Sequence, residues 1–505
     1  MSESKKINRR QFLGMTGSAV ALTVVPRHVL GGANYVAPSD KINLGLIGCG
    51  TQQIRELTSL ITDERVQVVS ICDPAKNPVG YADWSPNGIR NSVRQLLGDS
   101  SWGANIKGIP AGRDMCKEVV DKYYSNVRPG GSYRGCTAYS DFREMLEKER
   151  DMDTVKIITP DHQHGIQAIM SMKKGKNVIM HKPVANIVHE ARQTVKTARE
   201  TGVVTHLLAW AGRNQYDVVK DWIDQGAIGT LKEIHNWSFR PVWPQWPQLP
   251  EDRPPVPEGF DWDLWLGPVP DRPYHPNFTH NVYRGWYDFG AGSVADMGIY
   301  SLWPVFTKFG ITVPPVSIEA LGTTTNIITP EATCQMIVNQ HSFPHSCIFR
   351  WKFKARGSSP ALDLFWYDGG MKPHNPPEME ADGNELPREG MMFVGDKGKI
   401  IGGFHANNPR IIPESRMIEF TGQADPPPTS TQSGTDVWIN AVLKGEMSPG
   451  SFQSVEVCNE TTLLPVVALK AGRKVIYDPE KMEITNPPDA NRFLYREAYR
   501  SGWEI

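Results

Sequence analysis

The sequence predicts an α/β protein whose first domain is built on a doubly wound parallel sheet, and two observations carry this prediction. Apolar, strand-like runs alternate with helical stretches between residues 41 and 180. Such alternation is typical of a parallel sheet with helices on both faces. Two glycines, Gly48 and Gly50, also stand at the first strand-to-helix turn, where sheets of this kind bind ligands.

The opening unit consists of a predicted strand at 41–47, a helix at 51–60 and a second strand at 66–71. Glycine at the intervening turn lets the backbone approach a pyrophosphate that lies over the N-terminus of the helix. We therefore predict a dinucleotide site of the Rossmann type. Its glycines and the two residues that follow them are Gly48, Gly50, Thr51 and Gln52. The third glycine of the G-x-G-x-x-G pattern is replaced by Gln53.

An acidic residue, Asp73, follows the second strand, 25 positions after Gly48. An acid at about this place accepts hydrogen bonds from ribose hydroxyls and repels a 2′-phosphate. Asp73 therefore favours NAD over NADP, with Lys76 as the nearby residue that argues the other way.

Residues 77–135 form a predicted insertion with one helix at 113–124, and we interpret the insertion as a flap over the cofactor. The alternation of strands and helices then resumes. Helices are expected at 141–147 and 166–174, and strands at 154–158 and 177–180.

Charge and composition exclude other classes of protein. The 505 residues include 54 Lys and Arg against 55 Asp and Glu, so a strongly basic nucleic-acid binder is excluded. Arg9 and Arg10 precede a short apolar run at 14–25, which resembles a twin-arginine (Tat) export signal. We therefore expect export to the periplasm through the Tat machinery, and no stretch long enough to span a membrane.

Several ordered motifs resemble the Gfo/Idh/MocA family of NAD(P)-dependent oxidoreductases. In the first domain they are residues 45–50 (GLIGCG), 139–146 (YSDFREML), 159–164 (TPDHQH) and 175–183 (GKNVIMHKP). Further along, residues 240–245 (RPVWPQ), 261–268 (DWDLWLGP) and 284–290 (RGWYDFG) look like the exported branch of that family. The resemblance runs from about residue 40 to the end of the chain.

The family fold implies a second α/β domain with a large, open and mainly antiparallel sheet, which often makes the oligomer contact. We expect strands of this sheet at 231–239, 316–325, 333–340 and 346–353, and helices at 438–444 and 460–474. The predicted domains are a leader at 1–39, the Rossmann domain at 40–185 and the substrate-binding and oligomerisation domain at 186–505. A homo-oligomer formed through the C-terminal sheet is expected.

The resemblance places the chemistry at Lys182, which matches the family's catalytic lysine. The preceding acid of the usual Glu-Lys-Pro is His181 here, which removes a negative charge beside Lys182. The second catalytic element, Asp-x-x-x-His in many members, runs from Asp296 to Tyr300. Their spacing of four predicts that both side chains lie on one helical face.

The resemblance also implies that Thr159, Pro160 and His162 lie under the nicotinamide ribose, and that His181 and Lys182 contact the cofactor. Arg213 stands where the second domain first meets the substrate. No metal is expected, because no third group of ligands accompanies the Asp and His residues at 161–164.

Six tryptophans fall between residues 237 and 286, interrupted by prolines. Aromatic faces beside arginines suit stacking on a sugar ring and hydrogen bonds to its hydroxyls. The predicted substrate residues from this stretch are Arg240, Trp243, Arg284 and Trp286. Ordinary core packing is the alternative for each tryptophan.

These observations predict an exported oxidoreductase that transfers hydride between tightly bound NAD and a carbohydrate or cyclic polyol. Two alternatives remain. The first is a glycosidase-like enzyme that uses bound NAD as a transient oxidant. The second is a non-catalytic protein that binds a sugar or the cofactor, which the departures at His181 and Tyr300 favour.

Overall fold

The computed structural model describes residues 41–77, 80–127, 135–355, 357 and 360–505. The predicted export signal, with Arg9 and Arg10, lies outside the described residues. Residues 42–505 form one compact unit.

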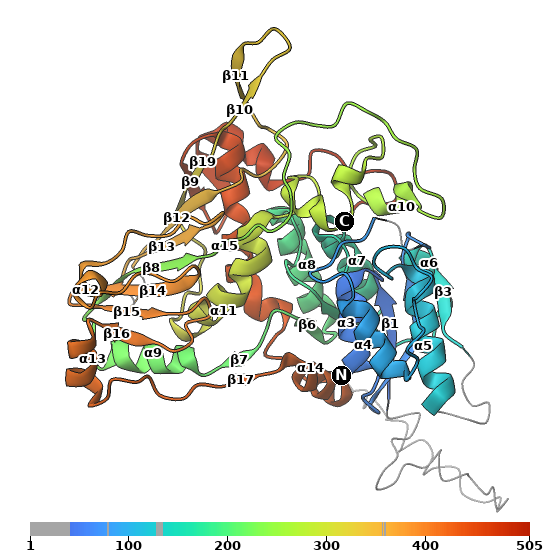
Figure 1. Cartoon of the computed structure of the whole chain (residues 1–505), viewed down its shortest axis with the longest axis horizontal. Helices are drawn as coiled ribbons and strands as arrows, with labels where there is room; N and C mark the ends of the chain where they lie inside the picture. The colour runs from blue at the N-terminus through green and yellow to red at the C-terminus, as the bar shows by residue number, and fades with distance from the viewer. Residues whose placement is uncertain (1–40, 78–79, 128–134, 356, 358–359) are drawn as a thin grey trace, which may run out of the picture. The chain divides into compact units, whose positions relative to one another are not determined.

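The first sheet has six parallel strands in the order β3-β2-β1-β4-β5-β6 (Figure 1). The strands are β1 (Ile42–Ile47), β2 (Val66–Cys72), β3 (Thr137–Tyr139), β4 (Thr154–Ile157), β5 (Asn177–Met180) and β6 (Thr205–Leu207). Strand order reverses beside β1, as in a doubly wound sheet. The predicted Rossmann fold is therefore confirmed. The sheet also includes β6, beyond residue 185, and the exact domain boundary stays a prediction.

The helices of this half are α3 (Thr51–Leu60), α4 (Gly88–Leu97), α5 (Arg113–Val127), α6 (Phe142–Lys148), α7 (Asp161–Lys173) and α8 (Val188–Thr201). The sequence analysis missed α4 in the insertion. Its apolar residues Ile89, Val93 and Leu97 recur every four positions and are buried. Gly98 ends the helix in the left-handed conformation that commonly terminates helices.

The second sheet has nine strands in the order β16-β15-β14-β8-β13-β12-β9-β18-β19. These are β8 (Leu231–Trp237), β9 (Ser317–Gly322), β12 (Cys347–Phe353), β13 (Leu362–Tyr367), β14 (Gly390–Gly395), β15 (Lys399–Gly402), β16 (Arg410–Ile412), β18 (Val475–Asp478) and β19 (Glu483–Asn486). The β13–β8 pair is parallel and the other ladders are antiparallel. This confirms the large, mainly antiparallel C-terminal sheet.

We predicted that residues 333–340 form a strand of this sheet, and that prediction is wrong. β11 (Cys334–Ile337) pairs with β10 (Thr325–Ile328) in a separate hairpin. The strand predicted at 316–325 stops at Gly322, and β10 begins after it. The hairpin projects from the sheet in Figure 1 and exposes Ile328 and Met336. An alternating strand pattern predicts strand conformation, but not the partner strand.

The remaining elements include the long helices of the second half and the short segments that surround the site. They are β7 (Gly212–Arg213), α9 (Gln215–Asp224), α10 (Trp262–Leu266), η2 (Pro276–Phe278), η3 (Asn281–Gly285), the π-helical turn η4 (Val294–Gly298), α11 (Ile299–Lys308), α12 (Pro377–Ala381), α13 (Glu414–Thr421), β17 (Thr431–Gln432), α14 (Gly434–Lys444), α15 (Phe452–Ala471) and η5 (Pro488–Leu494). The helix expected at 460–474 therefore begins eight residues earlier, at Phe452.

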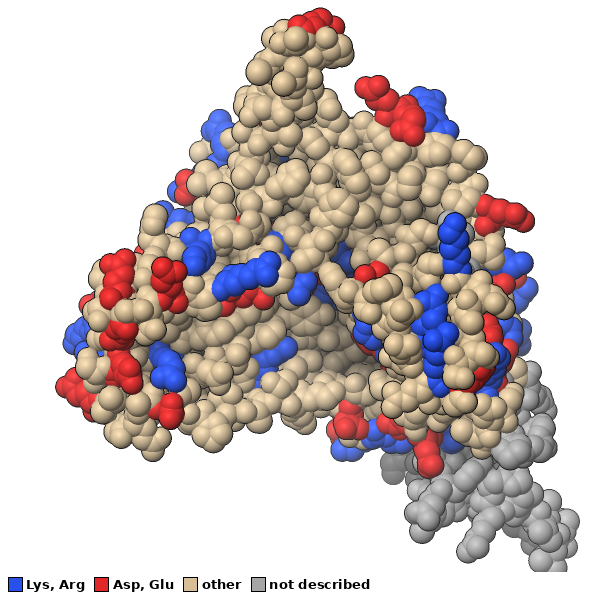
Figure 2. Space-filling view, in the orientation of Figure 1, with Lys and Arg blue, Asp and Glu red and all other residues tan. Residues whose placement is uncertain are grey.

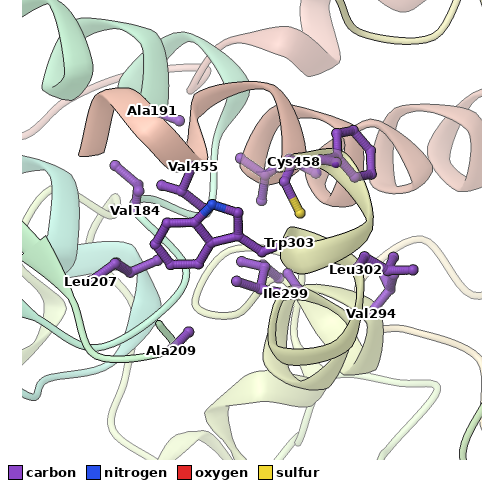
Figure 3. Close-up of a cluster of buried hydrophobic side chains, with 14 of the residues drawn as sticks. Val184, Ala191, Leu207, Ala209, Val294, Ile299, Leu302, Trp303, Val455 and Cys458 are labelled. Carbon is purple, nitrogen blue, oxygen red and sulfur yellow. The ribbon is translucent and has the colours of Figure 1, made fainter. Parts of the chain in front are cut away.

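A buried cluster joins the two halves of the molecule around Trp303 (Figure 3). Val184 and Leu207 come from the first half, and Val455 comes from α15. The indole Nε1 of Trp303 donates to the Ser454 carbonyl at 3.1 Å. One continuous apolar core therefore spans both halves, and it includes Val184, shortly after β5, together with Trp303 of α11.

Charged side chains of both signs are scattered over the face in Figure 2, without a continuous basic surface there. Within the described ranges, no helix combines the length and apolar character that crossing a bilayer requires.

Candidate functional site

Two cavities meet at the carboxyl ends of the Rossmann strands. The first, which we call the nucleotide groove, is lined by the Gly48 turn, Asp73 and the segment after β4. The second, which we call the substrate cavity, encloses ≈ 430 Å³ and is lined by Lys182, Asp296 and Tyr300. Both cavities share a set of lining residues: Thr51, Gln52, His181, Asn281 and Arg284. A ligand in one cavity would therefore contact a ligand in the other.

The glycine turn fits a pyrophosphate. Gly48 has φ of +90°, and a Cβ there would lie 2.2 Å from the Ile158 carbonyl oxygen. A Cβ at Gly50 would meet only Tyr81 Cε1, at 3.6 Å, so this glycine leaves space over α3. No acidic residue occupies the first turn of α3, and no side chain caps it. The N-terminus of α3 is therefore open to an anion.

Asp73 lies in the groove, where the sequence places it. Its Oδ2 accepts a hydrogen bond from the Cys49 backbone N–H at 2.6 Å, and its Oδ1 accepts from the Ala75 N–H at 2.7 Å. Burial raises the pKa of Asp73 to about 6, against the opposing effect of these two donors. The carboxylate thus braces the glycine turn and faces the place where a ribose would lie. Together with the open helix terminus, it fits a dinucleotide.

The groove is covered by residues that the sequence analysis did not single out. Tyr81 of the insertion stacks on His280, with ring centroids 3.9 Å apart and planes 15° apart. Both rings line the groove, and so does Trp503 near the C-terminus. The interpretation of the insertion as a flap agrees with the position of Tyr81. No local pattern predicts that His280 would be its partner.

Lys182 lines the substrate cavity and contacts the other two predicted catalytic residues. Its Nζ donates to Asp296 Oδ1, and the same oxygen lies 3.2 Å from Arg284 Nε. The Nζ atom also lies 5.4 Å from the centroid of the Tyr300 ring. The structure thus brings the three predicted catalytic residues together, although Asp296 is 114 positions from Lys182.

The helical geometry differs from the prediction. Asp296 belongs to the π-helical turn η4, whereas Tyr300 lies in the first turn of α11. The two side chains therefore do not share one face of a regular α-helix. The wider turn still leaves both of them lining the cavity with Lys182.

Burial and charge shift the titration of these groups. Burial lowers the pKa of the Lys182 ammonium, and the carboxylate of Asp296 opposes this shift. Burial alone would raise the pKa of Asp296, but Lys182 and Arg284 hold it below its ordinary value. Burial raises the pKa of the Tyr300 hydroxyl. Lys182 is therefore the residue better suited to release and accept a proton.

His181, which replaces the family's acid, pairs with an acid from another element. Its Nε2 lies 2.6 Å from Glu56 Oε1 on α3. The other carboxylate oxygen of Glu56 accepts from Lys156 Nζ at 2.6 Å, and Gln52 donates to Oε1 at 2.9 Å. Burial alone would raise the pKa of Glu56, but Lys156 and His181 hold it well below its ordinary value. A negative charge therefore remains close to the turn, one residue from Lys182.

The other predicted residues divide into two groups. Those that line the cavities are Thr51, Gln52, Thr159, Pro160, Arg213, Arg240, Trp243 and Arg284. His162 and Trp286 line neither. His162 Nε2 contacts the Trp265 carbonyl oxygen at 2.9 Å, and Trp286 Nε1 donates to the Asn277 carbonyl at 2.7 Å. Both rings belong to an aromatic core, so for Trp286 the packing alternative fits the structure.

Across the residues with described positions, no three His, Cys, Asp or Glu side chains cluster as metal ligands would. His405, which the sequence did not single out, also lines the substrate cavity, and its buried Nδ1 has no hydrogen-bond partner among the described residues.

Two protein-family models match successive segments of the chain. Residues 116–208 match "Oxidoreductase family, NAD-binding Rossmann fold", and residues 218–327 match "Oxidoreductase family, C-terminal alpha/beta domain". The glycine turn at 48–50 precedes the first match. Residues 209–217 lie between the two matches; they follow β6 and include Arg213, which lines the substrate cavity.

Individual relatives match shorter parts. Levoglucosan dehydrogenase of Pseudarthrobacter phenanthrenivorans is 30% identical over 112 residues, which is 21% of this chain and 28% of that protein. A glycosyl hydrolase family 109 protein of Shewanella pealeana is 25% identical over 243 residues, 45% of this chain and 44% of the relative. The chain thus matches less than half of the length of each of these relatives.

Among solved structures, the WlbA dehydrogenase from Bordetella pertussis, in complex with NADH and UDP-GlcNAcA, is 15% identical. The structural match covers 87% of this chain and 99% of the WlbA chain, with a TM-score of 0.49. The two family matches follow the chain in the same order as the Rossmann sheet and the C-terminal sheet. Residues 116–208 and 218–327 thus match, in this order, the NAD-binding Rossmann domain and the C-terminal α/β domain of the Gfo/Idh/MocA oxidoreductase family.

Proposed function

We propose that the protein is an oxidoreductase that transfers hydride between tightly bound NAD and a carbohydrate or cyclic polyol. One observation carries the proposal: a buried lysine, Lys182, lines the substrate cavity directly after His181, a residue that lines both this cavity and the nucleotide groove. A proton-accepting side chain at such a junction can reach a carbinol oxygen whose carbon faces the cofactor. The sugar dehydrogenases among the relatives support a carbohydrate substrate.

The residues of the cavity would divide the proton chemistry between them. Bound NAD supplies the hydride acceptor. Lys182, with its lowered pKa, takes the proton of the substrate hydroxyl, and Asp296 stabilises the ammonium that results. Tyr300, with its raised pKa, keeps its proton and can donate a hydrogen bond to the same oxygen. Arg284 fixes Asp296 from the other side.

The test starts with the purified protein as isolated. Denaturation should release NAD or NADH, identified by mass and absorbance. Sugars and polyols are then added to the native protein, and the absorbance of the reduced nicotinamide is followed together with product analysis. An oxidised product that accumulates with reduced cofactor supports the proposal. Binding of a sugar without any change at the nicotinamide would favour the non-catalytic alternative.

A glycosidase-like cycle is the second candidate, because the family 109 relatives match almost half of this chain. In such a cycle the cofactor would be reduced only transiently, and the sugar would lose its leaving group without net oxidation. Glycosides with a chromogenic leaving group distinguish the two candidates. Release of the chromophore without accumulated reduced cofactor favours the glycosidase-like cycle.

We further propose Tat export and a homo-oligomer formed through the C-terminal sheet. Arg9 and Arg10 support the first. Replacement of both by Lys should leave the protein in the cytoplasm with its signal uncut, and unchanged export would contradict the proposal. The exposed hydrophobic side chain of Leu321, on β9 of that sheet, supports the second. Light scattering after size exclusion would measure the mass, and a monomer would contradict it.

A further inference from the structure

The substrate cavity contains an excess of positive charge. Five cationic side chains line it, against two acidic ones, a surplus of three positive charges. The cationic residues are Arg55, Lys182, Arg213, Arg240 and Arg284, and the acidic ones are Asp83 and Asp296. A neutral sugar would need acceptors for its own hydroxyl protons as well as donors. The charged residues that line the cavity therefore indicate which kind of ligand it can bind.

Both acids are already paired with cations of the protein. Asp83 forms an ion pair with Arg55. Asp296 is held between Lys182 and Arg284. Neither carboxylate is thus left to neutralise the remaining guanidinium groups of the cavity, those of Arg213 and Arg240.

Arg213 and Arg240 have no ion-pair partner among the residues with described positions. Arg213 donates from NH1 to the Tyr300 carbonyl at 3.1 Å, and burial lowers its pKa. The Arg240 guanidinium lies 5.4 Å from the Phe239 ring centroid and 5.8 Å from that of Trp84. Guanidinium groups in partly buried places are commonly paired with an anion, because an uncompensated charge there is costly.

Buried hydrogen-bond donors that lack acceptors also indicate an anionic ligand in this cavity. In the described part of the chain, Arg240 Nε and Trp243 Nε1 are buried and have no hydrogen-bond acceptor. Both residues line the substrate cavity. Each of these atoms can only donate. Native proteins seldom leave such donors unsatisfied, so a ligand that is rich in acceptors fits here.

We propose that the substrate is an acidic sugar or polyol, whose oxyanion group binds between Arg213 and Arg240 while a hydroxyl faces Lys182. This inference rests on the proposed function and names its substrate class. A carboxylate matches the flat fork of a guanidinium through two parallel hydrogen bonds. A sulfate or phosphate ester presents the same kind of oxygens, and the experiment distinguishes these sources.

The experiment measures binding rather than turnover. The protein with its resident cofactor is titrated by calorimetry with matched series of hexoses in the gluco, galacto and manno configurations. Each series contains the neutral sugar, its uronate, its 6-phosphate and its 6-sulfate. In at least one series we expect an acidic member to bind at least tenfold tighter than the neutral sugar, and more weakly as salt is raised. The acidic member that gains most identifies the oxyanion.

Arg240→Gln should reduce the affinity ratio between the acidic and the neutral sugar at least tenfold. Arg240→Lys should keep part of this ratio because the charge remains. Arg410→Gln is the control. It removes an exposed arginine that lines neither cavity, so it should leave the preference for the acidic sugar unchanged. The wild-type panel remains decisive if an Arg240 variant misfolds.

The absence of any acidic preference in all three series overturns the proposal. Failure of the proposed function gives a different result. In that case an acidic sugar binds selectively, yet no sugar alters the bound nicotinamide. Conversely, cofactor reduction by neutral sugars, with no preference for acidic ones, would support the oxidoreductase and reject this substrate class.

Discussion

The nucleotide groove and the substrate cavity share five lining residues but satisfy their polar groups in different ways. In the groove, the Asp73 carboxylate accepts from two nearby backbone N–H groups. In the cavity, the donors of Arg240 and Trp243 have no acceptor within the described structure. The groove is therefore shaped by its backbone before a ligand arrives, whereas the cavity depends on side chains that a ligand would complete. Substitutions in the two cavities should therefore differ in their effects on turnover, stability and cofactor binding.

The largest effect is expected in the cavity. Lys182→Met keeps the length of the side chain and removes the proton-carrying group, so turnover should fall by about 10²- to 10⁴-fold. The amount of cofactor bound after purification should not change, because the glycine turn is intact. A double variant with Tyr300→Phe should cost little more than Lys182→Met alone. Steady-state and single-turnover kinetics would measure this, and nearly full activity would remove Lys182 from its proposed role.

In the groove, two neighbouring glycines should respond differently. Gly48→Ala should destabilise the fold by about 1–3 kcal/mol through its positive φ alone, with the overlap against Ile158 added. Gly50→Ala should fold with near-normal stability, because its Cβ meets only Tyr81 at 3.6 Å, but it should bind NAD more weakly. Thermal unfolding and cofactor titration test the pair. Equal stability of the two variants would contradict a groove shaped by its backbone.

The preference for NAD should depend on pH through Asp73, whose pKa burial raises to about 6. Above that pH the charged carboxylate repels a 2′-phosphate. Below it the neutral carboxyl does not, so the ratio of NAD to NADP affinity should fall, by roughly tenfold between pH 7.5 and 5. The variant Asp73→Asn should have a low ratio throughout. It also corrects for titration of the phosphate itself, which has a pKa near ~6. A ratio independent of pH in the wild type would contradict this.

The smallest effect concerns the ring pair over the groove. Aromatic pairs contribute about 0.5–1.5 kcal/mol, so Tyr81→Ala should speed cofactor release by roughly 2- to 12-fold. Tyr495→Ala removes another tyrosine–histidine contact, with His189, outside the groove. It is the matched control and should leave the release rate unchanged. Stopped-flow displacement with a fluorescent nucleotide analogue measures the rate.

The sequence predicted the parts of the molecule that are encoded locally. The first two Rossmann strands, the Gly48 turn and Asp73 lie within 32 residues of chain and follow from apolar runs and glycine spacing. The family resemblance located Lys182, Asp296 and Tyr300. It could not reveal that Glu56, 125 positions from His181, supplies the acid that His181 replaces, because nothing in either segment marks the other. The same holds for the stacking of Tyr81 on His280.

Trp286 illustrates why composition alone misleads. A tryptophan beside an arginine in a proline-rich stretch is equally consistent with a sugar platform and with a buried core. Its indole N–H bonds to a backbone carbonyl inside the aromatic cluster, and only the tertiary structure reveals this. Trp243, from the same stretch, does line the cavity.

The π-helical turn η4 sets a constraint on the length of the segment rather than on its residue types. Successive residues of an α-helix are separated by about 100° around the axis. Removal of a single residue between Asp296 and the start of α11 would let the turn relax to the α form and rotate the Asp296 carboxylate away from Lys182. We therefore expect insertions and deletions at 294–298 to damage the site as much as a substitution of Asp296 itself. Comparisons of related sequences should accordingly keep the residue count of this segment fixed when they align it.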